Sequence, residues 1–154
     1  MTIRYDWEPL AELLDDGAAA LALRHWQEIA LDQGDVPLEV DWDAVLAEEA
    51  AGVFRVFTAR SDGDLVGYIS CRVFRPSRYA GTVYVNDDVF WLDPTHRRGW
   101  TGYRLLSHFL AALPKPCKVQ IKHKLTFEGG RVGKLLERLG LRPVEVVSVA
   151  FLRE

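Results

Sequence analysis

The stretch from residue 82 to residue 113 constrains the fold most, because a hydrophobic strand runs through a short loop into an amphipathic helix. The strand pattern covers 82–92, and the loop at 93–102 reads Asp-Pro-Thr-His-Arg-Arg-Gly-Trp-Thr-Gly. Pro114 ends the helix, because proline cannot continue one. The helix is predicted by apolar residues that share one face at helical spacing: Leu105, Leu106, Phe109, Leu110 and Leu113. A strand that leads directly into a helix indicates an α/β architecture.

The remaining patterns predict one mixed α/β domain spanning residues 1–154, with a central sheet. Two strand patterns joined by a Ser-Asp-Gly-Asp turn at 61–64 indicate a hairpin. The other predicted elements are a strand at 2–5, one or two helices over 9–30 with a break at 15–17, a helix at 41–49 capped by Asp41, hairpin strands at 53–59 and 65–74, a strand at 118–122, a helix at 132–139 ended by Gly140, and a closing strand at 144–152.

Charge is divided unevenly along the chain. Residues 1–64 hold 15 acidic and 4 basic residues, whereas residues 65–154 hold 7 acidic and 15 basic ones. The halves therefore carry −11 and +8, which sum to the net charge of −3. The basic half suits an anionic ligand, and the acidic half resists nucleic acid or suits a cationic partner. Attraction between the two halves within one fold is the alternative explanation.

Neither the cysteines nor the apolar segments point to a secreted or membrane protein. Cys71 and Cys117 fall in predicted strands and lack metal-ligand spacing, so a reducing, cytoplasmic location is the simplest expectation. The apolar run 18–22 is too short to span a bilayer and follows acidic residues. We expect no metal and no membrane partner.

The loop before the amphipathic helix has the chemistry of a site for a phosphorylated ligand. The first backbone N–H groups of a helix have no partner within the helix and attract anions. Arg97 and Arg98 place two guanidinium groups beside them, and Gly99 and Gly102 let the backbone approach a ligand closely. An Arg- and Gly-containing turn also occurs for purely structural reasons.

These features together resemble the GNAT superfamily of acetyl-CoA-dependent N-acetyltransferases. The resemblance rests on the strand ending Trp-Leu-Asp-Pro at 91–94, the loop at 97–102 and the Leu-Leu-Glu-Arg-Leu-Gly-Leu ending at 135–141. More narrowly, the chain resembles small GNAT-like proteins encoded by bacteriophages and prophages. There a His-Trp-x-Glu segment, here 25–28, precedes the hairpin. The resemblance covers roughly residues 8–153, and it implies a central, mixed, mostly antiparallel twisted sheet flanked by helices.

The resemblance also implies where acetyl-CoA would bind as co-substrate. The superfamily loop binds the coenzyme A pyrophosphate through backbone amides, and Trp100 stands here where the family's middle glycine is usual. The implied residues for this contact are Arg97, Arg98, Gly99, Trp100, Thr101, Gly102 and Tyr103. Phe90, Trp91 and Leu92 would offer backbone groups to the pantetheine arm, which would pair like an added strand. The alternative for these three is a plain core strand.

Asp87 and Asp88 are the candidate catalytic groups. Acetyl transfer to an amine needs a group that accepts the amine proton and a donor for the developing oxyanion. The two carboxylates are adjacent in a hydrophobic strand, so their side chains point to opposite faces. At least one should therefore be buried, and burial should raise its pKa. The phage-type pattern favours Asp88, with Asp87 second; a structural role for the polar pair is the alternative. A backbone N–H near Leu92 is the candidate oxyanion donor.

The general acid is the missing part of the resemblance. Many GNAT enzymes carry a tyrosine in the last helix, where this chain has Leu136. Tyr103 and Tyr84 are possible substitutes that match no motif. A thiolate leaves without full protonation, so an acetyltransferase remains the first expectation. The alternative is a weak or inactive GNAT-like module that binds coenzyme A or a protein partner.

The acceptor side is weakly specified by the sequence. His25 and Glu28 lie one helical turn apart, and the resemblance makes them candidates for binding a small-molecule or protein amine; a surface pair or a packed histidine is the alternative. The basic residues at 115, 118 and 122–124 argue only weakly for nucleic acid, because no aromatic residues interleave with them and the whole chain is acidic. Contact with the coenzyme 3′-phosphate, or a solvated strand face, is the simpler explanation. A homodimer remains open.

Overall fold

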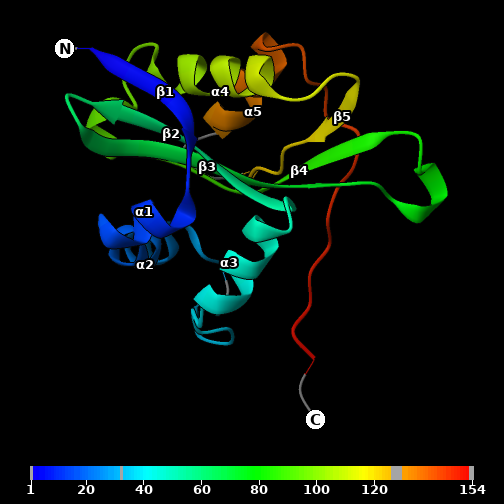
Figure 1. Cartoon of the computed structure of the whole chain (residues 1–154), viewed down its shortest axis with the longest axis horizontal. Helices are drawn as coiled ribbons and strands as arrows, with labels where there is room; N and C mark the ends of the chain where they lie inside the picture. The colour runs from blue at the N-terminus through cyan, green and yellow to red at the C-terminus, as the bar shows by residue number, and fades with distance from the viewer. Residues whose placement is uncertain (1, 32, 126–129, 153–154) are drawn as a thin grey trace. The chain divides into compact units, whose positions relative to one another are not determined.

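A computed structural model describes residues 2–31, 33–125 and 130–152 of the chain (Figure 1). The chain divides into two compact units. The first unit consists of Met1–Ala19 and Asp41–Lys122, and the second of Ala20–Val40 and His123–Glu154. The Phe-Glu-Gly-Gly segment at 127–130 predicts a loop that enters the last helix; except for Gly130, it lies outside the described residues.

The first unit contains a five-stranded sheet with the strand order β1-β2-β3-β4-β5. Neighbouring strands are antiparallel except for β4 and β5, which run parallel. The predicted mixed, mostly antiparallel sheet is therefore confirmed. The strands are β1 (Ile3–Glu8), β2 (Phe54–Ser61), β3 (Asp64–Phe74), β4 (Val83–Leu92) and β5 (Cys117–Gln120).

The predicted hairpin is formed by β2 and β3. Its two-residue turn consists of Asp62 and Gly63, whose φ angles are 50° and 101°. Two successive positive φ angles match the right-handed twist of the flanking strands, and an Asp-Gly pair adopts them with little strain. The hairpin turn fixes which face of β3 each side chain occupies.

Helices cover both faces of this sheet (Figure 1). Below it in the view lie α1 (Leu10–Asp15) and α3 (Trp42–Ala50), whose apolar residues pack on Phe54 and Val56 of β2. The side chain of Asp41 accepts a hydrogen bond of 3.0 Å from the Ala44 N–H, which confirms the predicted cap. Above the sheet lies α4 (Thr101–Ala112).

The core between α4 and the sheet is aromatic. Phe109 of α4 is fully buried, and its ring centroid lies 5.8 Å from that of Trp7 and 6.0 Å from that of Phe57. The Trp7 and Phe57 rings meet edge to face at 5.0 Å. Tilted and edge-to-face contacts of this kind stabilise a core beyond the burial of area alone. The packing fixes α4, and with it the loop that precedes α4.

An ion-pair network ties β1 to β2 and α1. The Arg60 guanidinium contacts Glu8 at 2.8 Å and Asp16 at 2.7 Å, and Thr58 donates a 2.7 Å hydrogen bond to Glu8. Burial opposes ionisation of Glu8, but the hydrogen bonds from Arg60 and Thr58 lower its pKa overall. Charge-assisted bonds of this type are the strong ones in proteins.

The second unit contains most of α2 (Ala18–Ile29) and all of α5 (Arg131–Arg138). The break that separates α1 from α2 falls at Asp16 and Gly17, as one of the two predicted arrangements requires. Gly140 follows α5 with a φ of 86°, which is the left-handed conformation predicted for the helix stop. Among the described residues, no helix combines the length and the apolar character that crossing a bilayer requires.

Two strand predictions need correction. Residues 144–152 form no strand, although their composition favours one; Val146 is 81% exposed and Val149 77% exposed. β-propensity becomes a strand only where a neighbouring strand supplies hydrogen bonds, and no described strand pairs with this segment. The strand predicted at 118–122 instead occupies Cys117–Gln120.

Candidate functional site

The centre of the candidate site is a β-bulge in β4 at Asp88. Val89 pairs with Ser70 of β3, whereas Asp87 pairs with the next residue, Cys71. Asp88 is therefore the extra residue that has no partner on β3. A bulge increases the local twist and re-aims side chains, and bulges are frequent beside active sites.

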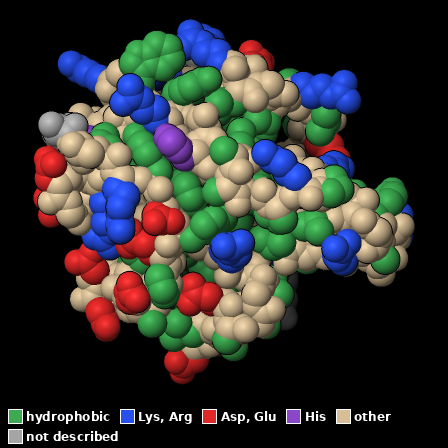
Figure 2. Space-filling model, turned by 45° about the horizontal axis from the view of Figure 1, so that its top comes forward, with side chains coloured by type: hydrophobic (Ala, Val, Ile, Leu, Met, Phe, Trp, Pro, Cys, Tyr) green, Lys and Arg blue, Asp and Glu red, His purple; other side chains and the backbone are tan. Residues whose placement is uncertain are grey.

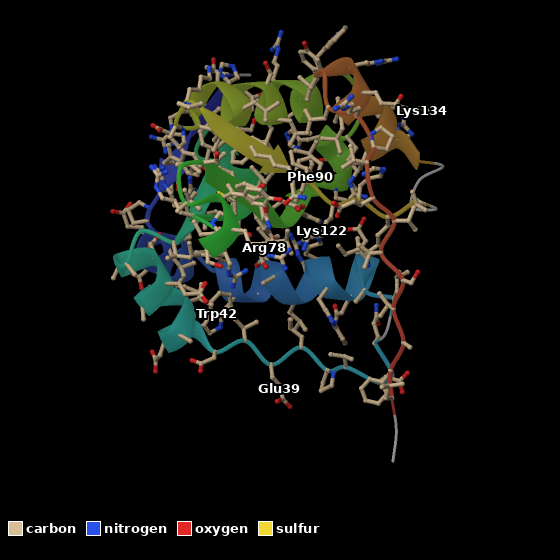
Figure 3. All side chains as sticks on the ribbon, turned by 90° about the vertical axis from the view of Figure 1, so that its right-hand side faces the viewer. Glu39, Trp42, Arg78, Phe90, Lys122 and Lys134 are labelled. Atoms are coloured by element: carbon tan, nitrogen blue, oxygen red, sulfur yellow. The ribbon has the colours of Figure 1, made fainter. Side chains whose placement is uncertain are left out.

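The sheet opens on the other side of β4 at the same place. The parallel pairing with β5 stops at Asn86 opposite Gln120, so residues 87–92 of β4 have a strand partner only on the β3 side among the described residues. Figure 3 labels Phe90 on β4 and Lys122 just after β5, the two sides of this opening. An unpaired strand edge is the surface onto which an extended, amide-bearing ligand adds as a further strand.

Asp87 closes the inner end of the opening. Its carboxylate accepts a 2.8 Å hydrogen bond from the Lys122 N–H, two residues beyond the end of β5. The residue is only 5% exposed, and burial raises its pKa to about 6, against the lowering effect of the Lys122 contact. The side chain continues the β4–β5 connection where backbone pairing has ended.

Asp88 lies in a different environment. Its carboxylate accepts a 2.6 Å hydrogen bond from the Arg72 guanidinium, which also forms an ion pair with Glu48 of α3 at 2.9 Å. The side chain of Asp88 is 41% exposed. The two adjacent carboxylates thus differ as alternation along a strand requires: Asp87 is buried and Asp88 is accessible to a substrate.

Tyr68 belongs to this site and was missed by the sequence analysis. It pairs with Trp91 in register, and the two ring centroids lie 6.0 Å apart. Burial, and then the negative charge of Asp88, raise the pKa of Tyr68, so its hydroxyl stays protonated. The alternation of β3 could have placed Tyr68 on the α1/α3 face, but the register with β4 depends on a bulge that the sequence does not reveal.

The backbone of β4 is held rigidly up to the loop. Trp91 and Leu92 are buried and Phe90 is half-buried. Gly67 of β3 faces Leu92, and a Cβ on Gly67 would lie 2.7 Å from the Leu92 side chain and 3.3 Å from that of Leu105. Only glycine therefore allows β3, β4 and α4 to approach this closely.

The loop after β4 is organised by its own side chains. Asp93 accepts hydrogen bonds from the Thr95 N–H at 2.9 Å and from the Thr95 hydroxyl, and it caps the short 3₁₀ turn Pro94–His96. The Arg97 Nε donates to the Leu92 carbonyl at 2.8 Å, which folds the guanidinium back onto the end of β4. Arg97 thus fastens the loop at the end of the open strand edge.

The loop ends at the amino terminus of α4. Gly99 has a φ of 90°, a conformation that favours glycine. Trp100, which is 64% exposed, precedes the helix and provides no side-chain cap, so the N–H groups of the first turn point out of the helix end. Those N–H groups belong to Thr101, Gly102 and Tyr103.

This helix terminus is electropositive for a second reason. The sequence contains no Asp or Glu between Pro94 and Phe127, a stretch that includes Arg97, Arg98 and Arg104. Arg98 is exposed. The partial positive charge of the helix end therefore adds to that of the arginines, as a bound phosphate requires.

The remaining expected residues belong to other elements. His25 and Glu28 both belong to α2 in the second unit, where His25 is buried and Glu28 is exposed, so they do not share one environment; a role in acceptor binding stays a prediction. Tyr84 is excluded as the general acid, because it lies eight residues, about 26 Å, before Leu92 on β4. Leu136 is buried on α5.

Solved structures with the same fold are acetyltransferases. An aminoglycoside acetyltransferase from an uncultured soil metagenomic sample superposes with a TM-score of 0.75 at 13% identity, covering 100% of both chains. A ribosomal-protein-alanine N-acetyltransferase from Brucella melitensis biovar Abortus gives 0.69 at 17% identity, covering 99% of this chain and 100% of the other.

A predicted acetyltransferase from Clostridium acetobutylicum, solved with acetyl-CoA, gives a TM-score of 0.63 at 12% identity, covering 97% of this chain and 96% of the other. No family model matches the chain, and no curated protein sequence matches it either. At these identities the similarity establishes the fold, which is that of the GNAT acetyltransferases.

Proposed function

We propose that the protein is an N-acetyltransferase that moves an acetyl group directly from acetyl-CoA to a primary amine. The observation that carries this proposal is the opening of the sheet after Asn86, with the loop and helix α4 at the end of the same strand. We also propose that the chain forms a single domain and that the protein is located in the cytoplasm of a bacterial or phage-infected host cell.

The residues at the opening fit coenzyme A. The N–H groups of Thr101, Gly102 and Tyr103, together with Arg98, suit the pyrophosphate. The edge of β4 beyond Asn86, where no described strand lies on the β5 side, suits the amides of the pantetheine arm. Acetyl-CoA supplies an activated thioester. The structure of the Clostridium acetobutylicum neighbour was solved with acetyl-CoA, which supports the same ligand here.

The chain's own groups then provide the proton transfers. Asp88 is the proposed general base, because it is accessible and its partner Arg72 fixes its orientation. Tyr68 stays protonated and is our proposed hydrogen-bond donor to the departing sulfur, since Leu136 has no proton to offer. A neutral donor that faces developing negative charge in a buried site is worth more than it would be in water.

The proposed acceptor is a cationic small molecule or a peptide amine. Glu48 and Asp88 share the single guanidinium of Arg72 at the bulge, so one net negative charge is left on the α3 face of the sheet to favour an approaching ammonium group. Among the neighbours, one is named an aminoglycoside acetyltransferase and another a ribosomal-protein-alanine N-acetyltransferase. Both acceptor classes are amines.

Two features favour a second candidate, a module that binds coenzyme A or a protein partner without efficient catalysis. Leu136 is buried where the resemblance implies a tyrosine, and Arg72 neutralises the proposed base. A module that binds coenzyme A shares this ligand with the proposed enzyme and differs from it in turnover.

A two-part experiment separates them. Thermal unfolding with and without acetyl-CoA measures binding, and release of free thiol with a panel of aminoglycosides, amino sugars and peptides measures transfer. Stabilisation together with thiol release supports the enzyme. Stabilisation without thiol release supports the binding module, and the absence of stabilisation contradicts both the enzyme and a module that binds coenzyme A.

A further inference from the structure

The far end of the β3–β4 hairpin carries a group of aromatic rings that the proposed function does not use. Tyr79 stacks on Tyr84 with a centroid distance of 6.0 Å and an interplanar angle of 9°, and Phe74 lies 6.1 Å from Tyr84. Tyr79 is 58% exposed. A nearly parallel pair whose outer ring faces solvent presents a flat aromatic platform.

One cation lies against these rings, and others are exposed in the neighbouring segments. The Lys118 Nζ of β5 lies 4.9 Å from the centroid of the Tyr84 ring. Arg75 and Arg78 are exposed in the same hairpin, and Lys115 is exposed just before β5. We call this group the arm surface, and its residues are Phe74, Arg75, Arg78, Tyr79, Tyr84, Lys115 and Lys118. The segments 74–86 and 113–122 contain no Asp or Glu.

The arm surface is distant from the acyl-CoA site. Tyr84 and Leu92 lie eight residues apart along β4, which corresponds to about 26 Å. The hairpin reaches beyond the rest of the sheet in Figure 1, and Figure 2 shows Lys and Arg side chains next to hydrophobic ones along it. Lys118 is therefore too far from the α4 terminus to contact the coenzyme 3′-phosphate. The contact with this phosphate that the sequence suggested for Lys118 does not fit the structure.

We propose that the arm surface binds a single-stranded nucleic acid. Exposed lysine and arginine side chains pair with phosphates, and a base stacks on the free face of Tyr79. The sequence showed no aromatic residue among the lysines, but the parallel pairing of Tyr84 with Lys118 brings a ring beside a cation. This inference does not depend on the proposed acetyltransferase activity.

Other occupants explain less of the surface. An acidic peptide would satisfy the cations but would leave the stacked, exposed rings without a role. A second copy's arm would bring like charges together, which is destabilising. Nucleic acid matches both features, because each nucleotide has an anionic phosphate and a flat base.

The test is fluorescence anisotropy with a labelled oligothymidylate of about 12 nucleotides. If four phosphate contacts form, raising the salt from about 50 mM to about 200 mM weakens binding about 50-fold. Tyr79→Ala should weaken binding at least about fivefold, which is the loss expected for one stacked base. The triple variant Arg75→Ser, Arg78→Ser, Lys118→Ser should abolish binding.

A charge-matched control uses exposed cations of the second unit. The triple variant Lys134→Ser, Arg138→Ser, Arg142→Ser changes the net charge equally and should retain binding; Figure 3 labels Arg78 and Lys134. Three results would overturn the proposal: no binding at low salt, equal losses in the two triple variants, or no effect of Tyr79→Ala. Displacement of the oligonucleotide by polyglutamate at equal charge would also overturn it. Stabilisation by acetyl-CoA should persist in every variant, so this test and that of the acetyltransferase fail separately.

Discussion

Replacing Asp87 by asparagine should stabilise the protein at neutral pH and not at acid pH. Burial raises the pKa of Asp87 from 3.8 to about 6, so the native state keeps a proton that the unfolded chain has lost within this window. Stability therefore falls as the pH rises through that window, and the full cost is present above it. The shift of about two pKa units corresponds to about 3 kcal/mol at pH 7.

Asp87→Asn removes this cost and keeps the acceptor oxygen for the Lys122 N–H. The expected gain in the free energy of unfolding is about 1–3 kcal/mol at neutral pH, and it should vanish near pH 4. Urea unfolding measured across this pH range gives the difference directly. A gain that does not depend on pH, or a loss that grows toward neutral pH, would refute the reasoning.

A matched variant isolates the hydrogen bond. Asp87→Ala also removes the charge but leaves the Lys122 N–H without its acceptor, so it should be less stable than Asp87→Asn by about 1–3 kcal/mol. The pair also tests catalysis. If Asp87 only braces the opening between β4 and β5, Asp87→Asn keeps both acetyl-CoA binding and turnover; a large loss of turnover alone would make Asp87 the base.

The remaining predictions concern the site and the core. Asp88→Asn should reduce turnover at least about 100-fold with little change in acetyl-CoA affinity, measured by steady-state kinetics; unchanged turnover would move the base elsewhere. Arg97→Glu combined with Gly102→Val should abolish acetyl-CoA binding in calorimetry while the far-UV circular dichroism stays the same, and normal affinity would contradict the assigned phosphate site. Phe109→Ala should cost about 3–5 kcal/mol in chemical unfolding, because a fully buried ring is removed; a cost below about 1 kcal/mol would mean that the core repacks.

Much of the sheet could be predicted because local chemistry determines it. The Asp62-Gly63 turn accepts two positive φ angles, so it specifies the β2–β3 hairpin without help from distant residues. Asp41 caps α3, and Gly140 follows α5, through equally local effects. The strand–loop–helix order around Arg97 also follows directly from the sequence.

What could not be predicted depends on long-range register. The alternation of side chains already separates Asp87 from Asp88, but the bulge at Asp88, which shifts the following residues of β4 by one against β3, has no sequence signal. The register of β3 with β4 places Tyr68 opposite Trp91, and the register of β4 with β5 places Tyr84 beside Lys118. The apolar pattern at 144–152 suggested a strand, but a pattern does not supply the hydrogen-bonding neighbour that a strand needs.

The central claim is that the open edge of β4 and the amino terminus of α4 together bind the coenzyme. Isothermal titration of acetyl-CoA into the folded wild-type chain tests it most directly. The account predicts saturable heat with one site per chain, lost in the variant that combines Arg97→Glu and Gly102→Val. No heat from well-folded protein, or equal heat from that variant, would contradict it.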